Sequence, residues 1–204
     1  KNNPGVVQVH AAYELASIPF TTYARFFEWF REISDIENAQ STQLLQQLLA
    51  DPRSEHDFSQ VLEQNLIKIK SQQHSSCLYI LKKALSNIFP EITDLYLEYH
   101  PQLQLMLCYK NQTLNYLQLS SSLKTWVALI GDIVRRLCIL NPMSINPCQE
   151  GHGILLIDHI DAHLDPTLCS VILDRLQATF PELQIIVTAQ QQSILDNSAY
   201  FQYF

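Results

Sequence analysis

Glycine is the residue type that this sequence most clearly lacks. Its 204 residues include only four glycines, Gly5, Gly131, Gly151 and Gly153. None of them stands in a strand-to-helix turn beside a lysine, and the phosphate-cradling motif GxxxxGK[ST] occurs nowhere. The sequence therefore contains no phosphate-binding loop of that kind.

Several other features are scarce. No apolar run approaches 18 residues and no signal-peptide pattern begins the chain, so we expect no association with a membrane. The 13 Lys and Arg residues are scattered and the net charge is −7, which argues against a chain that grips nucleic acid by charge alone. We expect any role with nucleic acid to be indirect.

The cysteines follow no metal-binding or disulfide pattern. There are five of them, an odd number without CxxC spacing, and four lie in apolar segments, where cysteine usually acts as a small hydrophobe. This usage predicts a reducing, cytoplasmic location. The chain begins with Lys1 instead of Met, so we expect it to be part of a longer polypeptide.

The first region, residues 1–92, is predicted to be mainly helical. In residues 22–34 the side chains of Tyr23, Phe26, Phe27, Phe30 and Ile33 share one helical face, and these aromatics are expected in the core. Trp29 lies off that face and could mark a contact surface. Further helices are predicted over residues 41–50, from Ser54 onward and over about 75–89, where Pro90 follows.

The second region, residues 93–204, changes pattern. Three short segments rich in Tyr and Leu predict an antiparallel meander, and residues 120–140 predict a long apolar helix. Residues 153–157 and 183–189 are apolar runs typical of buried parallel strands, joined by a helix that Asp165 and Pro166 open. The fold class is therefore α/β, with a parallel sheet and flanking helices, and both regions are expected to form one compact domain.

Chemistry is expected where the first parallel strand ends, because ligands bind beyond the carboxyl ends of parallel strands. Asp158 follows four apolar residues, the arrangement in which a carboxylate holds Mg²⁺, although many such residues only cap a loop. The neighbouring acids and histidines allow a second interpretation, a zinc-type metal cage. Its candidate ligands are Asp158, His159, Asp161, His163 and Asp165.

The motifs of the second region resemble those of ABC-type ATPases of the SMC/RecF-like branch. LLIDHIDAHLDP (155–166) is similar to the Walker B strand and D-loop, and LQIIVTAQQQSIL (183–195) to the switch strand and loop. LSSSLKTWVALIGDIVRRLCILNP (119–142) resembles the signature motif with its helix, and FFEWFREISDIEN (26–38) a segment upstream of it. The resemblance covers roughly residues 20 to 200 and implies the C-terminal lobe of a P-loop NTPase, with a helical insert.

The same resemblance identifies departures at the positions that carry the chemistry. His159 stands where the family has its water-polarising Glu, and Gln190 where it has the switch histidine. The signature motif LSxGE is here Leu119-Ser120-Ser121-Ser122-Leu123, so its nucleotide-contacting glycine and the following Glu are both replaced. The D-loop corresponds to His163, Leu164 and Asp165.

Three functions follow from these observations. The first is a degenerate, non-catalytic ATPase lobe that associates with a protein partner or a second copy and needs no cofactor. The second is the C-terminal part of a genuine ATP hydrolase of a DNA-repair or phage-defence type, whose phosphate loop and Mg·ATP site need a lobe outside this chain. The third is a metal-dependent hydrolase that uses the His and Asp cluster at residues 158–165.

Overall fold

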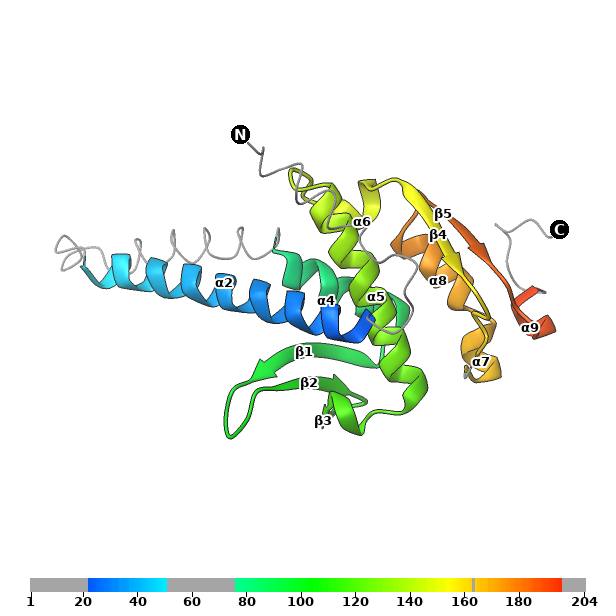
Figure 1. The fold of residues 1–204 in the computed structure, drawn as a ribbon, viewed down its shortest axis with the longest axis horizontal. Helices are drawn as coiled ribbons and strands as arrows, with labels where there is room; N and C mark the ends of the chain where they lie inside the picture. The colour runs from blue at the N-terminus through cyan, green and yellow to red at the C-terminus, as the bar shows by residue number, and fades with distance from the viewer. Residues whose placement is uncertain (1–21, 51–75, 163, 196–204) are drawn as a thin grey trace.

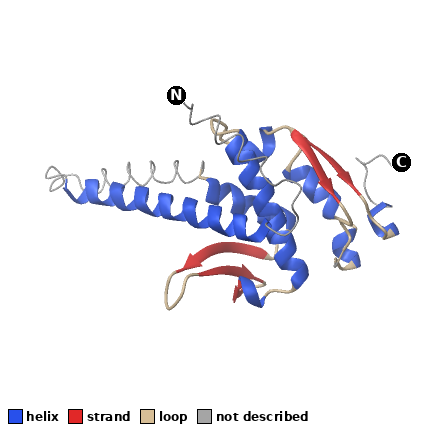
Figure 2. Ribbon diagram, in the orientation of Figure 1, coloured by secondary structure: helices blue, strands red, loops and turns tan. Residues whose placement is uncertain are grey.

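The computed structural model describes residues 22–50, 76–162 and 164–195 (Figure 1). In chain order its elements are α2 (Thr22–Ala50), α4 (Cys77–Ile88), β1 (Ile92–Glu98), β2 (Gln104–Tyr109), β3 (Gln112–Asn115), the 3₁₀ helix η3 (Tyr116–Gln118), α5 (Ser121–Leu140), α6 (Pro147–Glu150), β4 (Gly153–Ile157), α7 (Pro166–Cys169), α8 (Ile172–Thr179), β5 (Leu183–Val187) and α9 (Gln192–Leu195). Helices and strands thus occur together, as the predicted α/β class requires (Figure 2).

Helix α2 is continuous from the predicted helix at 22–34, through the polar residues 35–38 where that helix could run on, to the predicted helix at 41–50. Phe26 and Phe30 are fully buried, which confirms the core role of this aromatic face. Trp29 is half-buried and packs against the core, and its role as a contact surface stays a prediction. Asp35 and Glu37 still accept hydrogen bonds from Tyr99 and Leu78. The C-terminal part of α2 extends beyond α4 and α5, where a polar surface is compatible with helix (Figure 1). The helix predicted from Ser54 lies outside the described residues.

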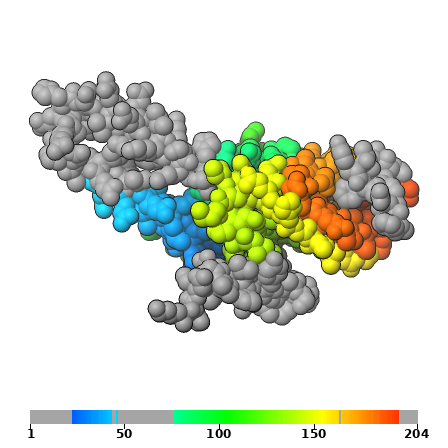
Figure 3. Space-filling model, turned by 90° about the horizontal axis from the view of Figure 1, so that it is seen from above, coloured from blue at the N-terminus to red at the C-terminus, as the bar shows by residue number. Residues whose placement is uncertain are grey.

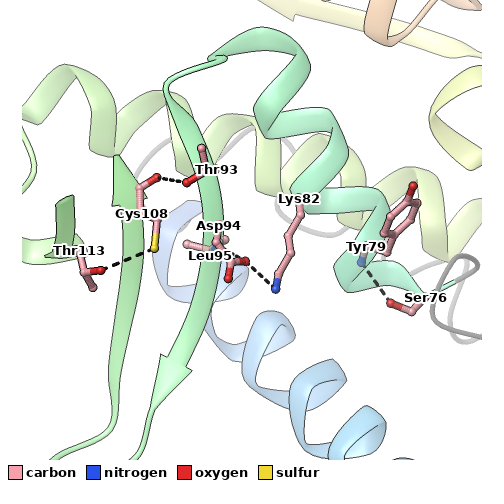
Figure 4. Close-up of polar contacts among 8 residues, drawn as sticks. All are labelled: Ser76, Tyr79, Lys82, Thr93, Asp94, Leu95, Cys108 and Thr113. Atoms are coloured by element: carbon pink, nitrogen blue, oxygen red, sulfur yellow. Dashed lines mark hydrogen bonds and ion pairs between the residues drawn. The ribbon is translucent and has the colours of Figure 1, made fainter. Parts of the chain in front are cut away.

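Helix α4 lies between α2 and the meander in the chain. Ser76 caps its first turn by accepting a hydrogen bond from the Tyr79 N–H (3.1 Å), and the helix ends at Ile88, before Pro90, as predicted. Lys82 forms a 2.7 Å ion pair with Asp94 at the start of β1 (Figure 4).

Strands β1, β2 and β3 form the predicted antiparallel meander, in that order. Lys110 and Asn111 connect β2 to β3 with positive φ values of 48° and 61°. A two-residue connection in this conformation matches the right-handed twist of the flanking strands. The meander begins at Ile92, one residue before the predicted second region; the division of the chain at that point stays a prediction.

Helix α5 is the centre of the core. It covers the predicted range and is capped at its end by Asn141. Val127, Ile130 and Val134 are fully buried, and the helix packs against both α2 and α4. At Gly131 an added Cβ would lie 2.2 Å from a ring carbon of Phe26, so the close approach of α5 to α2 requires glycine.

Strands β4 and β5 pair in parallel, as predicted. The helix predicted between them is interrupted at Ser170 and Val171, which separate α7 from α8. Leu155, Ile157, Ile185 and Val187 pack toward the core. Helix α8 lies beside the strand pair (Figure 1).

The opposite face of this strand pair is open. Ile154, Leu156 and Ile186 are 69%, 72% and 50% exposed. The prediction that both strands are buried is therefore wrong for this face. The physical reason is that, among the described residues, helices cover one side of the pair only. In the space-filling view, the yellow-to-red part of the chain, which includes the strand pair and α9, lies at the end of the molecule opposite α2 (Figure 3). Within the described ranges, no helix has the length and apolarity to cross a membrane.

Candidate functional site

The carboxyl ends of β4 and β5 carry the residues that the sequence singled out. Asp158 directly follows β4, and its carboxylate accepts a hydrogen bond from the Thr188 hydroxyl, which follows β5. The same hydroxyl oxygen accepts a hydrogen bond from the His159 N–H at 2.8 Å. The Thr188 backbone donates to Ile157 and accepts from Ile160, both at 3.0 Å. Thr188 therefore fixes the two strand ends to each other.

His159 adopts a left-handed conformation with a φ of 51°. Histidine is one of the few non-glycine residue types found there with some frequency, and the conformation turns the chain out of the strand. The side chains of Asp158 and His159 are both exposed. The predicted pair therefore lies at the strand end, facing solvent.

Asp161 is the most constrained polar residue of this edge. It is 5% exposed, and its Oδ2 accepts hydrogen bonds from the N–H groups of Gln190 and Gln191, both at 2.7 Å. Burial by itself would raise the pKa of this carboxyl, but these backbone hydrogen bonds outweigh it and lower the pKa below its ordinary value. Asp161 thus ties the loop after β4 to the loop that contains Gln190.

The D-loop residues have structural roles. Leu164 is buried, and Asp165 caps α7 by accepting a hydrogen bond from the Leu168 N–H at 2.9 Å. Hydrogen bonds from the Thr167 hydroxyl and from Leu168 lower the pKa of Asp165. The predicted cap and the following Pro166 are confirmed. His163 lies outside the described residues.

The signature serines lie at the start of α5. Ser120 is the N-cap and accepts a hydrogen bond from the Leu123 N–H at 3.3 Å, while Ser121 and Ser122 form the first turn. A hollow of about 720 Å³ separates this turn from the D-loop and the β2–β3 turn. Its lining includes Ser120, Ser122, Leu164, Asp165, Lys110 and Arg175.

The structure thus gathers the candidate residues into two places. Ser120 and Ser122 share the hollow with Leu164 and Asp165, whereas Asp158, His159 and Gln190 lie outside its lining, at the strand ends. Nucleotide or metal binding at any of these residues stays a prediction.

Metal binding was the alternative use of the acidic and histidine cluster. Across residues 22–50, 76–162 and 164–195, no three His, Cys, Asp or Glu side chains form a group that could hold a metal ion. Asp158 and Asp161 are each engaged in hydrogen bonds to the β5 side of this edge. The described members of the predicted cage therefore do not converge.

Sequence reasoning missed two residues of this edge. Thr188 was not singled out, and Asp161 was considered only as a metal ligand. Both act on partners about 30 positions away in the chain. The one available signal was their location just after two predicted parallel strands, which places them at one sheet edge without specifying a contact.

No protein-family model matches the chain. It is 34% identical over 210 residues to the retron Ec83 probable ATPase of Escherichia coli, a match that covers 90% of this chain and 38% of that protein. It is 28% identical over 183 residues to the retron Vc95 probable ATPase of Vibrio cholerae serotype O1 biovar El Tor, covering 83% and 35%. The chain therefore spans less than two fifths of the length of these relatives.

Solved structures similar to this chain include SMC ATPases. One, from work on ATP-driven dimerization and DNA-stimulated activation, has a TM-score of 0.45 at 17% identity and covers 65% of this chain and 78% of the other. Another is an Smc head domain with an extended coiled coil, bound to the C-terminal domain of ScpA and derived from Pyrococcus furiosus. Its TM-score is 0.43 at 15% identity, over 96% and 49%. The sequence relatives confirm that the chain is ATPase-related, as the resemblance of its motifs implied.

Proposed function

We propose that this chain is a non-catalytic, ATPase-related association module. The observation that carries this proposal is the open face of the β4–β5 pair, which presents Ile154, Leu156 and Ile186 to solvent. Leu156 and Ile186 are direct neighbours across the strands, so their side chains form one continuous apolar strip with Ile154.

Parallel sheets are normally covered on both faces, because their strands are apolar on both sides. Burying an aliphatic side chain contributes about 1.5–3 kcal/mol, so a partner that covers this strip gains several kcal/mol from the three residues. The partner that we propose is another ATPase-type polypeptide, since the relatives of this chain are named as probable ATPases.

The strand-end residues support a non-catalytic role. The Asp158 carboxylate is engaged by Thr188, and His159 and Gln190 stand where the resemblance implies a catalytic Glu and a switch histidine. The chain has a carboxylate at this edge but no phosphate-binding loop to hold ATP beside it. Mg·ATP would fit only where a phosphate-binding loop outside these 204 residues was supplied.

Calorimetric titration with Mg·ATP tests the catalytic part of the proposal. We expect no saturable heat for this chain, and micromolar affinity would overturn the non-catalytic function. Leu156→Glu and Ile186→Glu together test the association. Sedimentation velocity, with the chain alone and mixed with the full-length Escherichia coli relative, should show a complex that this double variant loses.

Leu117→Glu is the matched control, because Leu117 is 69% exposed but belongs to η3, outside the strand pair. This variant should associate like the unmodified chain. The open face is not an association surface if the unmodified chain, the Leu156→Glu/Ile186→Glu variant and the Leu117→Glu variant associate equally. The same conclusion follows if the unmodified chain stays a monomer and binds no partner.

A second candidate is the C-terminal part of a genuine ATP hydrolase. It is favoured by the lengths of the relatives, of which the chain spans 38% and 35%. The coding sequence upstream of Lys1 decides between the two. A GxxxxGK[ST] motif there, together with ATP hydrolysis by the longer polypeptide, would establish the hydrolase.

A further inference from the structure

The hollow beside the start of α5 has the size of a small-molecule site. Its volume is about 720 Å³, and pockets that bind small molecules measure about 300–1,000 Å³. Its lining includes neither the strand-end residues Asp158, His159 and Gln190 nor the exposed residues of the β4–β5 face. The hollow is therefore separate from both the strand ends and the proposed association surface.

Apolar and polar side chains share the lining of this hollow. The half-buried apolar members come from β2, β3, α5, α7 and the residue before α8, and they are Tyr109, Leu114, Leu123, Leu168 and Val171. Because they are only half-buried, they leave apolar surface inside the hollow in contact with water. A ligand with an apolar body would remove that surface from water, whereas a small inorganic ion would not.

The charged side chains of the lining are two bases and two acids. Lys110 lies close to both acids: its N–H donates to the Glu91 carbonyl at 3.0 Å, and its charge helps to lower the pKa of Asp165. The Asp165 carboxylate is also engaged as the cap of α7. The charge of Lys110 is thus largely offset at the β2–β3 turn.

Arg175 of α8 is the other base, and it has no such compensation. Among the described residues it forms no ion pair, not even with its chain neighbour Asp174. Its Nη1 donates to the Ile88 carbonyl at 2.8 Å, which holds the guanidinium at the end of α4. The guanidinium has further donors in a planar fork, and this fork fits the oxygens of an anionic group.

We propose that the hollow binds a small molecule with an apolar body and one anionic oxygen group, a carboxylate, sulfonate or phosphate. The body covers the half-buried apolar side chains, and the anionic group pairs with Arg175. Helix α5 supports this pairing, because Ser120 and Ser122 at its start line the hollow and the positive end of a helix dipole favours an anion. The site does not depend on the proposed association.

Titration of the full chain with anilinonaphthalene sulfonate tests the proposal. This probe joins an aromatic body to one sulfonate and fluoresces when it enters an apolar site. We expect fluorescence that saturates at equimolar probe. The open face also exposes apolar side chains, so the titration is repeated with the Leu156→Glu/Ile186→Glu variant, which should bind the probe as the unmodified chain does.

N-phenylnaphthylamine is the matched probe, because it has a similar aromatic body and no charge. It should bind about tenfold more weakly than the sulfonate. Arg175→Gln should weaken the sulfonate about tenfold and leave the uncharged probe unaffected, which a general loss of folding would not do. Lys83→Gln is the control, since Lys83 is exposed on α4 and lies outside the lining, and it should change neither affinity.

A second variant keeps the test independent of the Arg175 contact with Ile88. Leu168→Trp would fill part of the hollow and should weaken both probes, whereas Leu117→Trp, outside the lining, should weaken neither. The site is overturned by the absence of saturable fluorescence, by equal affinity for the two probes, or by unchanged binding in Leu168→Trp. Loss of binding in the Leu156→Glu/Ile186→Glu variant would place the probe on the open face instead, and displacement by Mg·ATP would show a nucleotide site; either result also contradicts the proposal.

Discussion

Asp161 shows how one carboxylate can organise an entire sheet edge. Both of its short hydrogen bonds come from the loop of Gln190 and Gln191, and hydrogen bonds to a charged acceptor are stronger than neutral ones. We expect Asp161→Ala to lower the free energy of unfolding by about 1–3 kcal/mol, because two part-buried backbone N–H groups lose a charged acceptor. Urea denaturation at neutral pH measures this change.

The stability that Asp161 contributes also depends on pH. Its pKa is lower in the folded protein than the ordinary Asp value of about 4, so the folded state favours the ionised form. The contribution is complete above that ordinary value and is lost as the pH falls through the lower folded pKa. Asp161→Asn should therefore remove part of the acid sensitivity of unfolding, whereas the control Glu28→Gln, on the exposed side of α2, should retain it. An unchanged acid profile in Asp161→Asn would contradict this.

Ser120 was singled out as an ancestral nucleotide contact, yet the structure gives it a capping role. We expect Ser120→Ala to lower the free energy of unfolding by about 1 kcal/mol, because the first turn of α5 loses its acceptor. Ser120→Asp should retain the stability, since Asp caps equally well and suits the helix dipole. Ser121→Ala, one position on, is the control and should cost little. Thermal and urea unfolding of the three variants would show a structural role if only Ser120→Ala is destabilised.

The sequence located these residues better than it described their contacts. Asp158, His159 and Gln190 lie at the ends of the two parallel strands, as the pattern indicated. The contacts of Asp161 and Thr188 could not be predicted, because hydrogen bonds across about 30 positions depend on the conformation of two loops. The left-handed backbone of His159 likewise follows from the turn and not from its residue type.

At the scale of elements, apolar periodicity predicted the helices wherever a helix packs on the core. It gave no apolar face over residues 35–40, so the sequence predicted that the helix could continue there only as a polar stretch, and the structure has one continuous α2. The break between α7 and α8 was missed for the opposite reason. Leu168 and Ile172 follow helical spacing across the break, although Ser170 and Val171 interrupt the helix.

The crossing of α2 and α5 depends on Gly131, and it gives a prediction at this scale. Alanine normally stabilises a helix interior by up to about 1 kcal/mol relative to glycine. Here the added methyl group would collide with the buried ring of Phe26, so we expect Gly131→Ala to lower the free energy of unfolding by about 1–3 kcal/mol. In a double-mutant cycle, Phe26→Leu should make the second substitution less costly. If the losses of stability from Gly131→Ala and Phe26→Leu were simply additive, α2 and α5 would accommodate the added methyl group without any effect of the Phe26 ring.

At the scale of the whole molecule, the two faces of the β4–β5 pair are unequal although their residues are alike. The apolar runs predicted two buried strands, and no local pattern separates a covered face from an open one when Leu and Ile occupy both. The difference arises from packing: helices cover the face of Ile185, while Ile186 points away from the core.

Adjacent residues on β5 therefore provide a matched test of this asymmetry. Ile185→Thr should lower the free energy of unfolding by about 1–3 kcal/mol, because it places a hydroxyl against the core. Ile186→Thr should change it by no more than about 0.5 kcal/mol, since that side chain is 50% exposed and threonine also favours strands. Both are measured by urea denaturation at a concentration where sedimentation shows a monomer. Equal losses would mean that the second face is also covered in the folded chain, and the association surface would then have to lie elsewhere.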